Sequence, residues 1–249
     1  MNEIAPFNTA QDFDNVGLLI GDLNAKVKNC IVSLDVTRDV LKLAKEKNVE
    51  LIVSHHPIIF DGLKKVLKEY LIYDVLQSKI SIIAAHTNLD VAEFGVSFCL
   101  AKALDILDVK ILENSMGFGR IGHLKESLDS EEFIKYVSKK LKTPVKAVKS
   151  SKKIKNVAVV SGSGHFALKA AKENSADALV TGESKHDVLI KAFDENFCFV
   201  DASHFATENV FCSFLVDMLR EKFKYSGVNF FVSNQKNPCV YAFGDSVWG

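Results

Sequence analysis

The stretch LKLAKEKNVELIVS (residues 41–54) aligns without gaps onto LKAAKENSADALVT (residues 168–181), and this internal repeat is the clearest indication of the fold. Six of the fourteen aligned positions are identical, and the same offset pairs Val32 with Val159. Each segment places apolar residues at helical spacing and then ends in a short apolar run typical of a buried strand. The chain is therefore predicted to contain two related βαβ halves. A chance likeness between two lysine-rich amphipathic helices is the alternative.

Strand-like and helix-like segments alternate along almost the whole chain around this pair. Apolar runs rich in β-branched residues predict strands at 30–36, 50–56, 80–87, 156–162, 177–183, 196–202, 228–233 and 239–243. Helical spacing of apolar residues predicts helices at 37–48, 63–79, from about His165, after 183, and over 207–223. This alternation favours an α/β fold with mostly parallel sheets. The lysine-rich stretch 141–156 is expected to connect the two halves, although PVKAV (144–148) also suits an edge strand.

Composition excludes several classes of protein. The 249 residues carry 31 basic and 31 acidic side chains, so charge does not support a dedicated nucleic-acid binder. No apolar run approaches the roughly 18 residues that span a bilayer, and the first residues lack the pattern of a signal peptide. The five cysteines are widely spaced and odd in number, which argues against a disulfide framework. Cys30 and Cys198 have apolar neighbours and are predicted to be buried in the protein interior as small apolar residues. A reducing compartment is expected for the protein, and the cytoplasm is the expected location.

Histidines and carboxylates gather just beyond the ends of predicted strands. Ligands in parallel α/β sheets bind outside the carboxyl ends of the strands, so these residues are expected to meet at one edge. The residues concerned are His55 and His56 after one strand, His86 and Asp90 after the next, and His204 and Glu208 after a third. The remaining histidines, His123, His165 and His186, have no such setting and are expected to be superficial or structural.

The spacing of these residues suits metal ions. His55 and His56 are adjacent, and in an extended chain their rings point to opposite sides, which suits two neighbouring metals. His204 and Glu208 are four residues apart at the start of a predicted helix and share one face. Imidazoles combined with carboxylates favour zinc, iron, manganese, cobalt or nickel over calcium or magnesium. A strand-end histidine can also be a hydrogen-bonded core residue, which is the commoner case for any single one.

Seven motifs in order resemble one known family across nearly the whole chain. They are DNVGLLIG (14–21), SLDVT (33–37), VSHHPIIF (53–60), HTNLDVA (86–92), VSGSG (160–164), VTGE (180–183) and SHFATE (203–208). The chain resembles the NIF-three-like proteins, also known as type 2 GTP cyclohydrolase I or dinuclear metal centre hexameric proteins. Where this family usually has Gly before the last histidine, the chain has Ser203, and where it often has Arg after the glutamate, the chain has Asn209.

The resemblance implies a site, an architecture and an assembly. Two divalent metal ions per chain are expected on His55, His56, Asp90, His204 and Glu208, with Glu208 bridging and His86 acting beside them as a catalytic group. Two related, interlocked α/β lobes are expected, with the metals in the cleft between them. The first comprises residues 1–115 and 225–249, and the second comprises residues 116–224. A ring-shaped homo-hexamer is expected as well.

The predicted function is hydrolysis by metal-activated water. By resemblance, the substrate is GTP or another small anionic or nucleotide-like molecule, although no residue pattern selects guanine. The alternative is a non-enzymatic metal-binding ring that acts as a scaffold for a protein or nucleic-acid partner. SGSG (161–164) is predicted to be a tight turn, with a phosphate cradle as the alternative. Asp14 and Asn15 are expected to form a turn or cap that walls the site.

Overall fold

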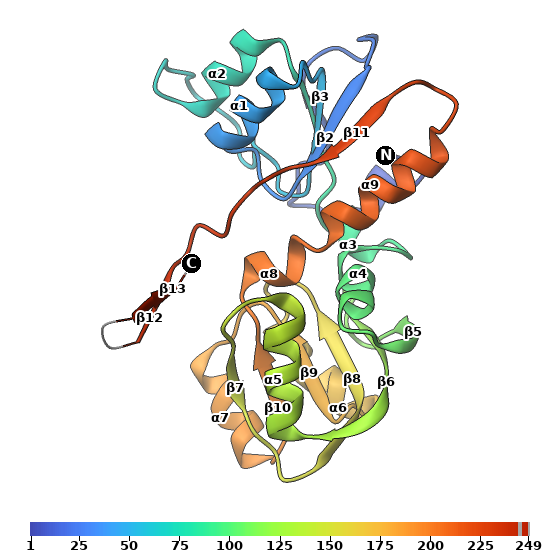
Figure 1. The fold of residues 1–249 in the computed structure, drawn as a ribbon, viewed down its shortest axis with the longest axis vertical. Coiled ribbons are helices and arrows are strands. Elements are labelled where there is room, and N and C mark those ends of the chain that lie inside the picture. The colour runs from blue at the N-terminus through green and yellow to red at the C-terminus, as the bar shows by residue number, and fades with distance from the viewer. Residues whose placement is uncertain (244–245, 249) are drawn as a thin grey trace. The chain divides into compact units, whose positions relative to one another are not determined.

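The computed structural model describes residues 1–243 and 246–248 and divides into two compact units. Unit 1 comprises Met1–Ala92 and Phe211–Lys236, and unit 2 comprises Glu93–Val210 and Asn237–Gly249. Figure 1 shows the elements of each unit. These bounds differ from the expected 115/116 and 224/225, because the helix after residue 95 packs on the unit 2 sheet and the helix after residue 210 packs on the unit 1 sheet.

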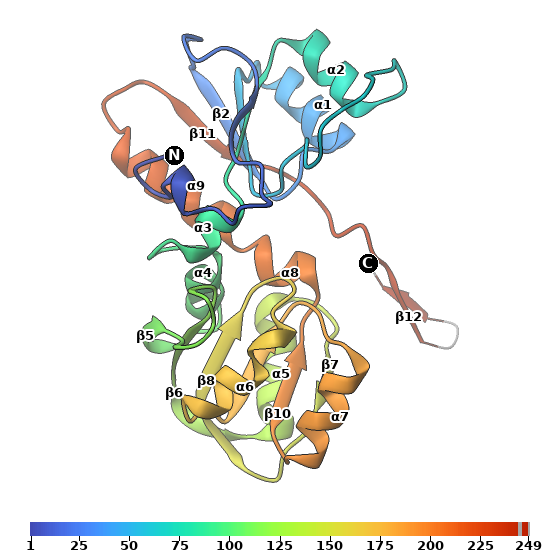
Figure 2. The ribbon, with the colours of Figure 1, turned by 180° about the vertical axis from the view of Figure 1, so that it is seen from behind.

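Unit 1 is built on a five-stranded sheet in the order β1-β4-β3-β2-β11. Its strands are β1 (Gly17–Ile20), β2 (Asn29–Ser33), β3 (Leu51–Ser54), β4 (Ser81–Ala84) and β11 (Asn229–Val232). All pairs are parallel except that of the edge strand β1 with β4. On one side lie α1 (Arg38–Glu46) and α2 (Leu71–Ser78), and on the other lies α9 (Phe211–Lys222), as Figures 1 and 2 show. The prediction of a mostly parallel sheet is confirmed for this unit.

Unit 2 has a six-stranded sheet in the order β5-β6-β8-β9-β10-β7. Its strands are β5 (Leu107–Ile111), β6 (Arg120–Asp129), β7 (Lys146–Val148), β8 (Lys153–Val160), β9 (Ala178–Thr181) and β10 (Cys198–Asp201). Only β8, β9 and β10 run parallel, and the other three pairs are antiparallel. The sheet of this unit is therefore mixed: β5 and β6 extend the parallel centre on one side and β7 on the other, all in antiparallel pairing.

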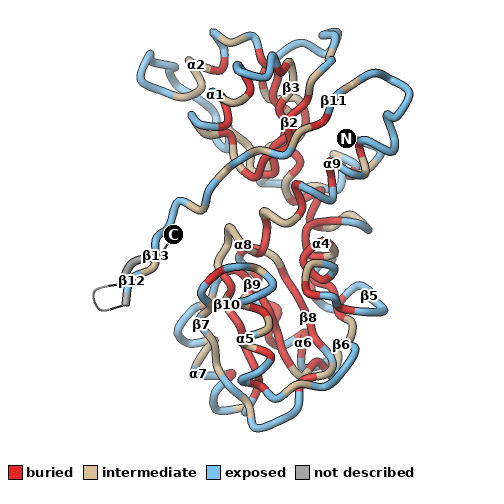
Figure 3. Tube along the Cα trace, in the orientation of Figure 1, coloured by how far each residue is buried: buried red, intermediate tan, exposed pale blue. Residues whose placement is uncertain are grey.

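Helices cover both faces of the unit 2 sheet and enclose two apolar cores. The helices are α4 (Val96–Ala103), α5 (Ser130–Leu141), α6 (Leu168–Glu173) and α7 (His186–Asp194). Val157 and Val159 point to the core shared with α4 and α5, whereas Ala158 and Val160 point to the core shared with α6 and α7. This alternation is the period of two expected for a strand buried on both faces. Figure 3 shows the buried residues running along these strands.

The internal repeat predicted from sequence is present as a repeated strand register. Val32 of β2 pairs with Val53 of β3, and Val159 of β8 pairs with Val180 of β9, so both pairs are related by the same shift of 127 residues. The loop bonds repeat as well: Oε2 of Glu50 accepts from the backbone N–H of residues 28 and 29, and Oδ2 of Asp177 accepts from that of residues 155 and 156. The two segments therefore form equivalent βαβ units, as predicted.

Two predicted helices are shorter than expected. Only Leu71–Ser78 of the predicted helix 63–79 is helical, because Val66 and Leu67 are exposed and give residues 63–70 no buried face. The predicted helix 207–223 is two helices, α8 (His204–Glu208) and α9. They are separate because α8 packs on α4 in unit 2, whereas α9 packs on β2 and β11 in unit 1.

The stretch 141–156 is not a connection between the halves. It lies within unit 2, where Lys146–Val148 forms the edge strand β7 next to β10. The edge-strand alternative for PVKAV is therefore confirmed. The C-terminal strands β12 (Tyr241–Phe243) and β13 (Ser246–Trp248) form an antiparallel pair, and a strand was predicted over 239–243. Among the described residues, every helix is too short or too polar to cross a lipid bilayer.

Candidate metal centre

Three histidines meet at one edge of the unit 1 sheet. His55 and His56 follow β3, and His86 follows the neighbouring parallel strand β4 with Ala85 between. One ring nitrogen from each of the three lies within 4.8 Å of the others. The ring centroid of His55 lies 5.1 Å from that of His56 and 5.1 Å from that of His86. The predicted gathering of strand-end histidines is confirmed for this unit.

Each of these rings is fixed through its Nδ1 atom. Nδ1 of the fully buried His55 lies 2.8 Å from the carbonyl oxygen of Ala85. Nδ1 of His56 lies 2.6 Å from Oδ1 of Asp35, and Nδ1 of His86 lies 2.9 Å from Oδ1 of Asp14. Because an oxygen of this kind accepts the Nδ1 proton, the lone pair of each neutral ring is on Nε2. Most histidines that bind a metal through one ring nitrogen likewise donate the N–H of the other ring nitrogen to an oxygen atom.

Carboxylates complete the unit 1 cluster. Asp90 lies on α3 (Thr87–Val91), and its Oδ1 atom is 3.6 Å from Nε2 of His55. Asp14 accepts from both the backbone N–H and the hydroxyl of Thr87 at the start of this helix. Burial raises the pKa of Asp14, but the hydrogen bonds from Thr87 and His86 outweigh it and hold the pKa below its usual value. Asp14 thus fixes the helix that carries Asp90 as well as the His86 ring.

Unit 2 presents a second pair of donors on α8. Nε2 of His204 lies 2.8 Å from Oε2 of Glu208, and Nδ1 of His204 lies 2.7 Å from Oε1 of Glu183, so the ring is fixed as in unit 1. Burial alone would raise the pKa of Glu183. The hydrogen bonds from His204 and Ser163 together outweigh burial and hold the pKa below its usual value. Glu183 therefore serves as an anionic acceptor for the Nδ1 proton.

The turn 161–164 is hydrogen-bonded to α8 and to two other elements of unit 2. The backbone N–H of Ser161 donates to Oγ of Ser97, that of Gly162 to Oγ1 of Thr207, and that of Gly164 to Oγ1 of Thr181. With these donors used inside the unit, the turn does not offer the open set of N–H groups that a phosphate cradle needs. The tight-turn interpretation of SGSG is confirmed.

A pocket lies beside two residues of the unit 1 cluster. It has a volume of about 440 Å³ and includes Asp35 and His56. The remaining walls are mostly apolar and are formed by Val36, Pro57, Ile58, Tyr70, Leu71 and Ile72. A polar end next to largely apolar walls is the usual composition of a site for a small molecule.

Three of the residues that organise this site were not predicted from the sequence. All three lie in quoted motifs, yet only a turn or cap was expected of Asp14, and Glu183 was explained equally well by a solvated helix start. The only sequence feature that could have revealed these three residues is that each is acidic and lies in a motif near a strand end. A turn or the start of a helix explains such an acidic residue equally well. Among the described residues, the groups of metal donors do not include His123, His165 or His186.

In each unit taken by itself, the chemistry of the donors suits a transition-metal ion. Four imidazoles hold their Nδ1 protons against an oxygen, and two carboxylates lie close to Nε2 atoms, Asp90 by His55 and Glu208 by His204. Mixed nitrogen and oxygen donors of this kind suit zinc, iron, manganese, cobalt or nickel. The histidines make calcium and magnesium less suitable, because these cations prefer oxygen ligands.

Known proteins resemble this chain over nearly its full length. A protein of Clostridium acetobutylicum named GTP cyclohydrolase 1 type 2 homolog is 31% identical over 222 residues, covering 84% of this chain and 82% of that protein. A protein of the same name from Clostridium perfringens is 30% identical over 250 residues, covering 96% and 95%. The crystal structure of a hypothetical protein of Staphylococcus aureus superposes with a TM-score of 0.92 at 29% identity, covering 97% and 96%. The Duf34/NIF3 (NGG1p interacting factor 3) family matches residues 1–238, and the chain belongs to this family.

Proposed function

We propose that this protein is a hydrolase that depends on divalent transition metals, with up to two ions per chain. The proposed ligands are His55, His56, Asp90, His204 and Glu208, with Glu208 bridging. The observation that carries the proposal is the orientation of the four histidines, each of which directs Nδ1 to a carboxylate or carbonyl oxygen. Bound ions of this kind lower the pKa of water and polarise an electrophile.

The residues around the ligands have separate roles in this proposal. Asp35 and Glu183 hold the rings of His56 and His204 in the tautomer that presents Nε2. His86, held by Asp14, takes part in proton transfer to or from the substrate. The pocket beside His56 binds the part of the substrate next to the reacting bond, and its apolar walls suit a planar or apolar group.

The substrate class follows from the family and from charge. Curated relatives carry the name GTP cyclohydrolase 1 type 2 homolog, which makes GTP the first substrate to test. Two divalent cations with two carboxylates leave a local positive charge, which favours a small anionic or nucleotide-like molecule. We also propose a homo-hexamer in the cytoplasm, where the free state of all five cysteines is the expected one.

Metal content and turnover measured together test the proposal. Untagged protein is analysed for bound metals and assayed on GTP, phosphodiesters and phosphomonoesters with and without chelator. Glu208→Ala should lose most of its metal because a bridging carboxylate serves both ions, and His56→Ala should lose metal and activity together. His186→Ala is the matched control, because it replaces an exposed histidine outside the donor groups.

Two results would contradict the proposal. A full metal complement in Glu208→Ala would remove the bridging role. Metal-loaded wild-type protein that releases no product from any of these substrates would favour the alternative, a metal-binding ring that acts as a scaffold for a partner.

A further inference from the structure

The side chain of Gln235 contacts the carboxylate that orients His56. The strand β11 runs parallel to β2 with Val232 opposite Val32, and the backbone N–H of Ser233 donates to the carbonyl of Val32 at 2.9 Å. Continuing this register brings Gln235 opposite Asp35, although the two residues are 200 positions apart in sequence. The contact is therefore set by strand pairing.

Gln235 holds both the backbone and the side chain of Asp35. Its Oε1 atom accepts from the backbone N–H of Asp35 at 2.9 Å and from Oγ of Ser33 at 3.0 Å, and its Nε2 donates to Oδ2 of Asp35. The orientation of the amide follows from these partners, because the Asp35 N–H can only donate and a carboxylate can only accept. With Oδ2 occupied in this way, Oδ1 faces His56.

The chain of contacts ends on the ring nitrogen that decides the tautomer. Oδ1 of Asp35 lies 2.6 Å from Nδ1 of His56. A carboxylate at this distance holds the proton on Nδ1 and leaves the lone pair on Nε2, the atom proposed to bind metal. We infer that Gln235 is a positioning residue, which acts through Asp35 to fix the tautomer and orientation of His56. This inference rests on the proposed metal-binding role of His56.

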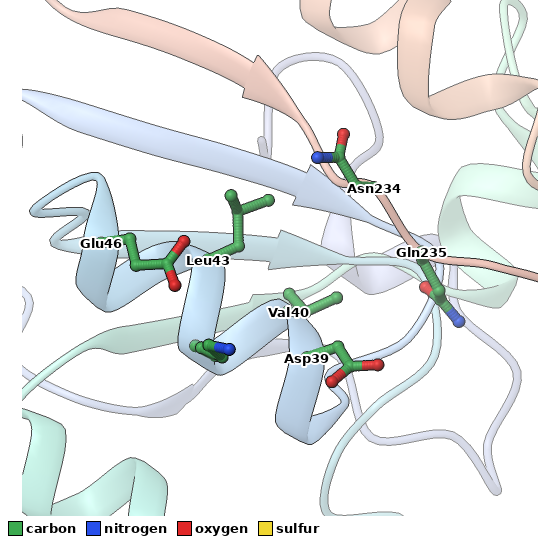
Figure 4. Close-up of a pocket in the computed structure, with 7 residues that line it drawn as sticks. Asp39, Val40, Leu43, Glu46, Asn234 and Gln235 are labelled. Carbon is green, nitrogen blue, oxygen red and sulfur yellow. The ribbon is translucent and has the colours of Figure 1, made fainter.

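Gln235 is half-buried in unit 1 and has an exposed neighbour that can serve as a control. Figure 4 shows Gln235 and Asn234, which follow β11, together with Asp39, Val40, Leu43 and Glu46 of α1. These residues line a shallow pocket of about 190 Å³. Asn234 is exposed and lines the same pocket one position earlier, so Asn234→Ala is the matched control for Gln235→Ala.

The experiment compares wild type, Gln235→Ala, Gln235→Glu and Asn234→Ala. Magic-angle-spinning NMR of metal-free protein with ring-¹⁵N histidine reports the tautomer of each ring, and the His56 signal is assigned by its loss in His56→Gln. Competition with a chelator gives the Zn²⁺ affinity, and a thermal scan gives the unfolding temperature. Gln235→Glu keeps Oε1 but replaces the donor with a carboxylate oxygen that repels Asp35.

The expected result separates positioning from a structural role. Gln235→Ala and Gln235→Glu should show His56 as a mixture of tautomers and a Zn²⁺ affinity about 10- to 100-fold lower, the usual effect of losing an outer partner. Asn234→Ala should change neither. A lower unfolding temperature with the wild-type tautomer and affinity would overturn the inference. Wild-type protein that binds no Zn²⁺ would contradict the proposed function, while the tautomer comparison would still decide the role of Gln235.

Discussion

The Oε1 atom of Glu208 occupies the space that a side chain at Gly162 would need, because a Cβ atom there would lie 2.1 Å from it. Gly162 also has a φ of +60°, in the left-handed region that favours glycine. Gly162→Ala should therefore displace the Glu208 carboxylate and lower the metal content of purified protein severely. Metal analysis beside urea unfolding checks both effects.

Gly227→Ala is the control for backbone strain. Gly227 has a φ of +73° but nothing within 4 Å of its Cβ position, so alanine there meets only the conformational cost of about 1 kcal/mol. Gly227→Ala should lose stability and keep its metal. Equal metal content in the two variants would mean that the close approach of Gly162 to Glu208 does not contribute to metal binding.

Ser203 is predicted to be a strained residue whose replacement by glycine stabilises the protein. Its φ of +65° with ψ of +146° lies in a region that is almost confined to glycine. Ser203→Gly removes strain of about 1–3 kcal/mol, and loss of the helix cap to the Ala206 N–H costs only a few tenths. The free energy of unfolding should rise by about 1 kcal/mol in urea titrations. Ser203→Ala, which keeps the strain and loses the cap, should lower it.

His86 is predicted to act in proton transfer and not to hold metal. His86→Ala should keep most of the bound metal and lower turnover by about 10- to 1000-fold, the range of acid–base and outer-partner losses. The measurement is metal content beside turnover, with His56→Ala for comparison. Since His86 also offers a ring nitrogen within 4.8 Å of those of His55 and His56, a metal loss as severe as in His56→Ala would make it a ligand.

Buried thiols should weaken the fold at alkaline pH. Burial raises the pKa of Cys30 and Cys99 to about 12 and that of Cys198 to about 11, whereas an unfolded thiol titrates near 8.5. Above about pH 8.5 the unfolded chain therefore loses protons that the folded chain keeps. The free energy of unfolding should fall by up to about 1.4 kcal/mol per pH unit for each thiol as pH approaches the folded pKa.

Urea unfolding of wild type and Cys99→Ala between pH 8 and 10.5 checks this prediction. The variant should show a shallower fall with pH, whatever its stability at neutral pH. An identical slope would mean that Cys99 ionises equally in both states. Labelling with a thiol reagent should modify the exposed Cys239 well before the four buried cysteines.

The proposed hexamer predicts a solution mass six times the 27.6 kDa of one chain. Several large apolar side chains are exposed on the single chain, including Phe13 at 66%, Met116 at 67% and Phe193 at 71%. Large apolar surfaces seldom remain open to water on monomers, so an interface is the expected use. Light scattering that shows a stable monomer at micromolar concentration would contradict this prediction.

The βαβ repeats were predictable because their signals are local. Helical spacing followed by an apolar run is visible in residues 41–54 alone, and the register of Val32 and Val159 follows from the alignment. The long strand β6 was missed because its half-exposed sequence RIGHLKESLD is stabilised by pairing with β8, a contact that local patterns do not encode. The split of 207–223 was missed because the pattern does not show that its two parts pack on different units.

The candidate site shows the same division between local and distant information. His55, His56 and His86 were predictable from their places after strands. Their acceptors were not, because Asp35 and Asp14 lie 21 and 72 residues from the rings they hold. Gln235 is farther still, 200 residues from Asp35, and only the parallel pairing of β11 with β2 brings it there.

The discontinuous chain path of unit 1 has a consequence for the order of events on the ribosome. Every strand of the six-stranded sheet precedes residue 202. In unit 1, by contrast, β2 can pair with β11 only after Asn229, where β11 begins, has been synthesised. During synthesis, the second unit can thus complete its sheet while the edge of β2 still exposes unpaired backbone groups. The amide that orients Asp35 emerges later than β11 itself. A nascent chain therefore acquires this hydrogen-bond partner of Asp35 only after every strand of the unit 2 sheet has been synthesised.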